Sequence, residues 1–230
     1  MGLFDLFKKE KKNTKAESHL PQYLYSEEEL DVLDSFITDM FGNYKNVFHE
    51  IASPDVHLDV CIVDPTEAEP YYKLVTMGAG AYTMAIPEAW KEYQLEHAEY
   101  VIYLPKDWNL NSGENNDYWP IKLLKDVARL PIWCETWLGY GHTTQADEEG
   151  SPYAENTRFN SVVLKYGENK NGDVRLIMPS GKVINFYEII PLYPEELQYK
   201  MEHDADALFE LFEKEGIPYR ILNLNRKSAL

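Results

Sequence analysis

Apolar residues recur every three or four positions between residues 26 and 41, a spacing that places them on one face of a helix. Ser26 and Glu29 have the spacing of a capping box at the start of this segment, and Gly42 follows its last apolar position. The pattern therefore predicts a first helix that ends at Gly42. Its buried face is expected to comprise Leu30, Leu33, Ile37, Met40 and Phe41.

Alternation of apolar and polar residues, together with β-forming side chains, predicts strands at residues 57–63 and 71–78. Residues 98–105 form a continuous apolar and aromatic run, which is typical of a strand buried on both faces. We expect this strand at the centre of the sheet. Further strands are predicted at residues 160–166, 174–178 and 183–190, the last two joined as a hairpin through residues 179–182.

Two more helices are predicted in the second half of the chain. The first begins near Asp117, and Pro131 is expected to stop or kink it, because proline lacks the amide hydrogen and its ring clashes with the preceding turn. The second begins after Pro194 and ends at Gly216, with the acidic residues 202–206 on its solvated face. The expected buried stripes are Ile121, Leu124, Val127 and Ala128 in the first of these helices, and Leu197, Met201, Leu208, Leu211 and Phe212 in the second.

This order of elements predicts an α+β fold. Most connections are too short for helical crossovers, so we expect a mixed, mainly antiparallel sheet flanked by helices. At 230 residues the chain fits one large domain with extensions. The expected division is a leader at residues 1–20, a single domain at residues 21–218 and a C-terminal tail at residues 219–230, with residues 145–158 as the most mobile internal loop.

The chain carries 39 acidic against 22 basic residues, a formal net charge of −17. This charge argues against sequence-independent binding to nucleic acid and favours a basic protein partner. Residues 1–15 have the opposite sign, because they contain five lysines and only Asp5 and Glu10. With the apolar residues Leu3, Phe4, Leu6 and Phe7 they suggest either a solvated tail or a short amphipathic anchor that contacts a membrane surface and tethers a scaffold there.

No sequence signal directs the protein out of the cell or across a membrane. Leu6 stands where the myristoylation pattern requires Ser or Thr, and no apolar run is long enough to span a bilayer. A cytoplasmic location is therefore expected. Cys61 and Cys134 lie in apolar contexts without CxxC spacing, which predicts reduced, buried thiols.

The segment from Trp119 to Thr144 is the candidate functional region, because it combines aromatic side chains with Cys134, Glu135 and His142. A catalytic thiol needs a base within hydrogen-bonding reach and an electropositive environment, whereas Cys134 lies between a tryptophan and an acid. The residues favour an inert cysteine and a loop histidine that binds neighbouring groups. A small hydrolase using His142 with Cys134 or an acid is the alternative hypothesis.

Metal and phosphate sites are not predicted. His49 and His57 lack the i, i+4 spacing of an HExxH zinc site, and residues 78–80 are glycine-containing without the Gly-Lys-Ser/Thr of a phosphate loop. We expect no cofactor and no metal.

Motifs spread over about 165 residues resemble those of the suppressor-of-fused family, in particular of its bacterial members. No single motif is specific, and the resemblance depends on their order. The matching segments are Ile51-Ala52-Ser53-Pro54, the strand from Tyr72 to Gly78, Trp119-Pro120 with Leu124, Val127 and Ala128-Arg129, then Glu135, Gly141-His142, Val162 to Leu164, Phe186 with Glu188-Ile189-Ile190, and Glu195-Glu196-Leu197.

The resemblance implies a single mixed α/β domain that binds a protein and catalyses no reaction. Animal members hold an extended peptide of a transcription factor as an added strand, and two residues that hold it there correspond to Leu130 and Gly141 here, so a different partner is expected. Bacterial members are commonly interpreted as immunity proteins, and an acidic inhibitor suits a basic toxin. The expected partner surface comprises Leu130, Trp133, Trp137, Tyr140, Gly141, His142 and Thr143.

Overall fold

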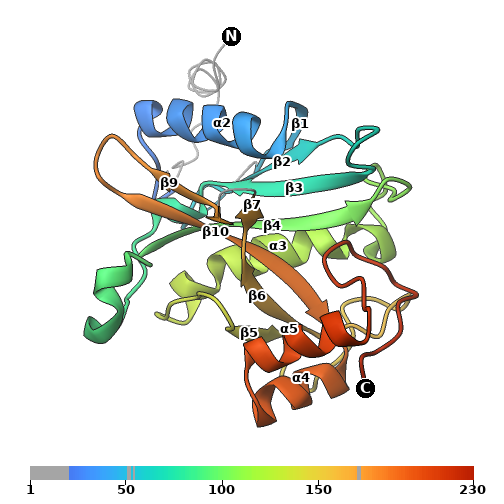
Figure 1. Cartoon of the computed structure of the whole chain (residues 1–230). Coiled ribbons are helices and arrows are strands. Elements are labelled where there is room, and N and C mark those ends of the chain that lie inside the picture. Colours follow the sequence, from blue (N-terminus) through green and yellow to red (C-terminus); the bar gives the residue numbers. More distant parts are fainter. Residues whose placement is uncertain (1–20, 51–52, 54, 170–171) are drawn as a thin grey trace.

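The computed structural model describes residues 21–50, 53, 55–169 and 172–230. The expected leader and its membrane contact through residues 1–15 lie outside these ranges, as do Ile51, Ala52 and Pro54 of the family-like segments. A mixed sheet crosses the domain, with α2 over one face and α3 over the other, and α4 and α5 pack at one end (Figure 1).

The strands of the main sheet are β1 (Tyr44–Phe48), β2 (Asp59–Val63), β3 (Tyr71–Met77), β4 (His97–Pro105), β5 (Thr143–Gln145), β6 (Ser161–Tyr166), β9 (Arg175–Ile177) and β10 (Val183–Leu192). A separate ribbon consists of β7 (Glu168–Asn169) and β8 (Gly172–Asp173). The helices are α2 (Glu27–Phe41), α3 (Asn115–Trp133), α4 (Pro194–Glu202) and α5 (Ala205–Lys214), with short 3-10 segments η1 (Ala79–Ala81) and η2 (Glu88–Tyr93).

Strand β4 lies at the centre of the sheet, as its apolar sequence predicts. The order is β1-β2-β3-β4-β10-β6-β5, with β9 also beside β10. β3 pairs with β4 in antiparallel orientation, whereas β10 pairs with it in parallel and sets Tyr187 opposite Tyr100. The other described pairs are antiparallel. The α+β prediction with a mainly antiparallel sheet is confirmed, although β1 and β5, at the two ends of this order, were not predicted.

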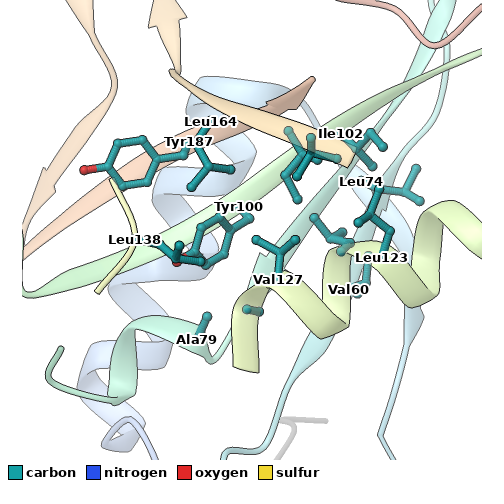
Figure 2. Close-up of a cluster of buried hydrophobic side chains, with 14 of the residues drawn as sticks. Val60, Leu74, Ala79, Tyr100, Ile102, Leu123, Val127, Leu138, Leu164 and Tyr187 are labelled. Atoms are coloured by element: carbon teal, nitrogen blue, oxygen red, sulfur yellow. The ribbon is translucent and has the colours of Figure 1, made fainter. Parts of the chain in front are cut away.

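The central strands are buried on both faces, which explains their high apolar content. Successive side chains point to opposite faces of a strand, so neighbouring residues enter different layers of the core. The layer on the α3 side includes Val60, Leu74, Tyr100, Ile102, Leu123 and Val127 (Figure 2). The layer on the α2 side includes Leu33, Ile37, Cys61, Val75 and Val101.

Helix α2 forms as its sequence predicts. The Glu29 amide donates to Ser26 Oγ and the Ser26 amide donates to a Glu29 carboxylate oxygen, both at 3.1 Å. This reciprocal pair satisfies two of the amides that a helix start leaves without a partner. At the other end Gly42, at φ +118°, donates to Thr38 O at 3.0 Å, so the glycine supplies a backbone conformation that other residues rarely adopt.

Helix α3 does not stop at Pro131. It continues to Trp133, and the Cys134 amide still donates to Leu130 O at 2.9 Å. Pro131 removes one amide within the last turn, and its buried ring packs in the domain. Because the helix ends only two residues later, the missing hydrogen bond and the steric clash are confined to the end of the helix.

The predicted final helix is two helices, α4 and α5, so the prediction of one continuous helix was wrong. Asp204 has extended backbone, and its carboxylate accepts from the Ala207 amide at 2.8 Å as the N-cap of α5. Aspartate stabilises a new helix start better than it does a helix interior. The break removes Met201 from the expected stripe and leaves this side chain 65% exposed.

Residues 219–230 lie against the domain. Ile221 forms an isolated bridge with Tyr103 of β4, and the Leu222 amide donates to Tyr103 O at 2.8 Å. Further on, the side chain of Arg226 is buried beside α4.

Candidate functional site

The C-terminal turn of α3 presents the most exposed aromatic residue of the expected partner surface. Trp133 is 58% exposed, and its Nε1–H donates to Asp55 Oδ2 at 3.1 Å. The helix ends at its C-cap, Cys134, and the next residue, Glu135, has a left-handed φ of +48°. The Thr136 amide then donates to Pro131 O at 3.0 Å. This backbone closure is a Schellman motif with a non-glycine residue at its left-handed position.

The buried guanidinium of Arg129 fixes the segment that receives Trp133. It donates to Asp55 Oδ1 at 3.3 Å, to Ser53 Oγ at 3.3 Å and to a carboxylate oxygen of Glu50. Burial raises the pKa of Asp55, but hydrogen bonds from the Val56 amide and other donors outweigh it and hold the pKa below its usual value. Asp55 is therefore a carboxylate at neutral pH, and the orientation of Trp133 is set before any partner binds.

The turn after α3 brings Trp137 and His142 together. Their ring centroids lie 4.3 Å apart, and His142 Nδ1 lies 3.2 Å from Trp137 O. A carbonyl oxygen can only accept, so this contact places the proton of the neutral ring on Nδ1. Burial is the main cause that lowers the pKa of His142, so the imidazole is neutral at pH 7.

Tyr140 and Gly141 face α5. The Tyr140 ring stacks on Tyr166 at 5.0 Å, and its hydroxyl donates to the Asp206 carboxylate. Gly141 has φ +75°, and a Cβ added there would lie 3.1 Å from Ala205 Cβ. The structure thus divides the seven expected residues: Tyr140 and Gly141 pack toward α5, whereas Leu130 and Trp133 line a groove on the other side of the turn.

This groove lies between α3 and β5 and has a volume of about 490 Å³. Leu130, Trp133 and Thr144 line it, together with Trp119 and Tyr153, whose rings stack at 5.4 Å. Trp119 is buried, and its Nε1–H has no hydrogen-bond partner in the described part of the chain. A buried donor without an acceptor costs about 1–3 kcal/mol, so an acceptor that reached it from the groove would remove a penalty.

Strand β5 is an edge of the sheet beside the groove. It pairs with β6 through Thr143–Val163, Thr144–Val162 and Gln145–Ser161, and no described strand pairs with its other side. His142 O and the Ala146 amide bond toward β6, so the alternation of an antiparallel ladder directs the backbone groups of Thr143 and Gln145 outward. Both the N–H and the C=O of these two residues face away from the sheet.

The thiol expected to be buried is exposed. Cys61 is buried as predicted, but Cys134 lies at the exposed end of α3, where the helix leaves the sheet. The sequence could not show this because its apolar neighbours, Ile132 and Trp133, are themselves only partly covered. Among the described residues no hydrogen bond joins Cys134 to His142, whose Nδ1 faces Trp137 O.

The other histidines considered as candidate metal ligands make structural contacts. His49 and His57 lie 3.1 Å and 3.3 Å from the two carboxylate oxygens of Asp59, and no group of metal-binding side chains was found in the described ranges. No described helix is both long and apolar enough to cross a bilayer. The sequence did not predict Asp55, Tyr153 or the free edge of β5 as parts of this site. Arg129 and Ser53 do belong to family-like segments, and the structure joins them by a hydrogen bond.

The fold and the site define an α+β domain with a helix layer on each face of a mixed sheet and an unpaired edge strand beside a groove. The model of the family described as Suppressor of fused protein (SUFU) matches residues 54–227, and the chain belongs to this family. An uncharacterized protein of Ureaplasma parvum serovar 3 is 25% identical over 216 residues, which cover 90% of this chain and 98% of that protein.

Solved structures show the same fold. A putative SUFU homolog from Neisseria gonorrhoeae has a TM-score of 0.61 at 17% identity and covers 89% of this chain and 98% of its own. A chain of the Sufu–Fu complex has a TM-score of 0.61 at 11% identity and covers 87% of this chain and 90% of its own. Drosophila Suppressor of Fused has a TM-score of 0.56 at 10% identity and covers 91% of this chain and 53% of its own.

Proposed function

We propose that this protein is a non-enzymatic binding module that takes an extended segment of a basic protein partner onto the edge of β5, and that it acts as an immunity or antitoxin-like inhibitor. The observation that carries this proposal is the free outer side of β5 beside the groove of α3. Of the expected surface residues, Leu130 and Trp133 line this groove and Thr143 lies in β5 beside it, while Trp137, Tyr140, Gly141 and His142 shape the turn that leads into β5.

An added strand would bond to the backbone of Thr143 and Gln145. Strand addition supplies main-chain hydrogen bonds regardless of sequence, and pockets for alternate side chains supply specificity. The groove offers such a pocket, with apolar surface from Leu130 and Trp133. An apolar side chain of the added strand fits this surface.

The charge of the protein supports a basic partner. At a net charge of −17 the protein attracts a positively charged domain at long range, which raises the rate of encounter. An inhibitor must bind a toxin before the toxin acts, so a high rate of association suits this role. The similarity to a chain of the Sufu–Fu complex supports a domain of this fold in a protein assembly.

The geometry of the turn favours binding over catalysis. A nucleophilic thiol requires a base within hydrogen-bonding reach. His142 instead donates from Nδ1 to a carbonyl oxygen, and its ring packs on Trp137. These contacts support a structural role for His142.

Substitution of Gln145 tests the binding edge. Gln145→Pro removes an outward amide and places a ring where the added strand would lie, but it leaves the inward hydrogen bonds to β6 intact. Gln145→Ala is the matched control, because it keeps the amide. A random peptide library is depleted on the Gln145→Pro variant and then selected on the wild-type chain, and we expect enriched basic peptides that bind wild type and Gln145→Ala alike. Failure to enrich any such peptide contradicts the proposed edge.

A further inference from the structure

An exposed arm, residues 87–94, projects from the domain before β4. Every residue in this range is exposed, whereas Ile86 and Leu95 at its two ends are buried. The Met84 amide donates to Glu96 O at 2.8 Å and closes the base of the arm. The arm lies at the edge of the domain, as the green segment ahead of β4 (Figure 1). A compact loop with closely spaced ends is a common site of function.

The arm carries two large aromatic side chains that the domain does not use. Trp90 is 49% exposed and Tyr93 is 51% exposed, and their ring centroids lie 5.6 Å apart. With Trp133 they are the large aromatic side chains most exposed in the described ranges. Tryptophan and tyrosine are the residues most enriched among the few that dominate binding energy at protein interfaces.

The arm is held in one conformation. Arg175 of β9 donates to Tyr93 O at 2.6 Å and to Gln94 O at 3.4 Å, and the buried Asn185 of β10 donates to Gln94 O at 2.8 Å and to His97 O at 3.1 Å. Side chains from two strands thus donate hydrogen bonds to the carbonyl oxygens of Tyr93 and Gln94, where the chain returns from the arm to β4. A preorganised anchor loses less conformational entropy on binding than a mobile loop does.

Apolar surface continues from the arm onto β9. Arg175 and Ile177 point to the same face of β9, because side chains alternate along a strand and the intervening Leu176 is buried. Arg175 donates a hydrogen bond to the arm. Ile177, which is 72% exposed, therefore lies on the same face of the sheet as the arm.

The arm also borders the turn that follows α3. The Leu138 amide lies 3.4 Å from the sulfur of Met84, next to the base of the arm. The turn that follows Trp133 and the base of the arm therefore contact each other through Leu138 and Met84.

The charge of the arm selects the kind of partner. The arm and its base carry three carboxylates, Glu88, Glu92 and Glu96, against Lys91, which pairs with Glu88 at 2.6 Å, and Arg175 of β9, so one negative charge is in excess. A second copy of the chain is a poor binding partner for the arm, because two molecules of net charge −17 repel each other. A basic surface complements both the arm and the whole protein.

We propose that the arm is a second anchor for a basic protein: Trp90 and Tyr93 pack against apolar side chains of that protein while Glu92 and Glu96 face its lysine and arginine side chains. The proposal rests on the proposed function, since it concerns a protein partner, but it uses an element apart from β5. The whole surface then extends from β5 past Trp133 to η2.

A second selection tests the arm separately. The same peptide library is depleted on a full-length Trp90→Ala/Tyr93→Ala variant and then selected on the wild-type chain. We expect enriched peptides that carry an apolar residue beside Lys or Arg, and whose affinity for the variant is at least about tenfold weaker than for wild type. Met201→Ala, which truncates another exposed apolar side chain, is the matched control and should keep wild-type affinity.

The outcomes separate the two proposals. Both substituted residues are exposed, so thermal unfolding should change little and lost binding would not reflect lost folding. No enrichment after depletion on the arm variant, or enrichment of acidic peptides, overturns the arm proposal. If that happens while depletion on Gln145→Pro still yields basic binders, the proposed function stands without the arm.

Discussion

The guanidinium of Arg226 meets the carboxylate of Glu196 in two contacts of 2.6 Å, Nη1 to Oε1 and Nη2 to Oε2, with both side chains buried. The same guanidinium lies 4.7 Å from the ring centroid of Tyr193 and 5.0 Å from that of Phe159. Arg226 comes from the last residues of the chain and Glu196 from the first turn of α4. This bidentate pair therefore fastens the C-terminal segment to the domain.

Removal of one partner of this pair should destabilise the protein strongly. Arg226→Ala leaves the Glu196 carboxylate buried without a cation, and we expect a loss of about 3–5 kcal/mol in the free energy of unfolding by urea denaturation. Arg158→Ala is the matched control, because exposed Arg158 pairs with Glu195 at 3.2 Å and should contribute about 0.2–1 kcal/mol. Equal losses in the two variants would show that burial of the pair has no effect on its strength.

Glycine at position 135 should stabilise the protein. Glu135 has a φ of +48°, a left-handed conformation that costs a residue with a side chain roughly 1–2 kcal/mol. Glu135→Gly relieves this strain, and we expect a gain of about 1 kcal/mol, part of it offset by the greater entropy of the unfolded chain. Glu135→Ala keeps the strain and should stay close to wild type. Identical stabilities for the two variants would rule out backbone strain at this site.

Glu99 should make stability depend on pH. Its buried carboxylate accepts from the amides of Gly78, Ala79 and Gly80 and from the hydroxyls of Tyr25 and Thr76. Burial outweighs these donors and raises the pKa of Glu99 to about 6, above the ordinary value of 4.5. The native state therefore binds this proton more tightly than the unfolded state does.

The sign of the effect follows from that difference. The contribution of Glu99 is fully present below pH 4.5 and is lost as the pH rises to about 6. Glu99→Gln cannot titrate, so the stability of wild type relative to this variant should fall by on the order of 1–2 kcal/mol between the two pH values. Urea denaturation of both proteins at several pH values measures this. A difference that does not vary with pH would show that folding leaves the pKa of Glu99 unchanged.

The two cysteines should react differently in the native protein. Cys134 is exposed, whereas Cys61 is buried and burial raises its pKa to about 12, so it is not a thiolate at neutral pH. A disulfide reagent should modify one thiol rapidly and the second only after unfolding, as followed by absorbance and mass. Cys134→Ser should abolish the fast phase. Two fast thiols, or none, would contradict the structure at this position.

Local patterns predicted the elements whose causes are local. Ser26, Glu29 and Gly42 fix the limits of α2 through hydrogen bonds to residues at most four positions away. The largely apolar and aromatic sequence of β4 correctly predicted the sheet centre. The same rules missed the helix break at Asp204, where capping competes with periodicity, and Pro131 did not stop α3, which continues to Trp133. β5 is three residues long, and it is a strand only because β6 pairs with it.

The sequence by itself determined the α+β class, the main strands, the acidic charge and the resemblance to the suppressor-of-fused family, because these depend on composition, periodicity and the order of motifs. Only the tertiary structure decided which residues meet: Arg129 and Trp133 on Asp55, the free edge of β5 beside its groove, and the exposed pair of Trp90 and Tyr93. The contacts with Asp55 and the free edge of β5 depend on residues far apart in the chain, and the exposure of Trp90 and Tyr93 depends on which surfaces the rest of the domain covers. Strand pairing and burial decide these relationships, and no local pattern encodes them.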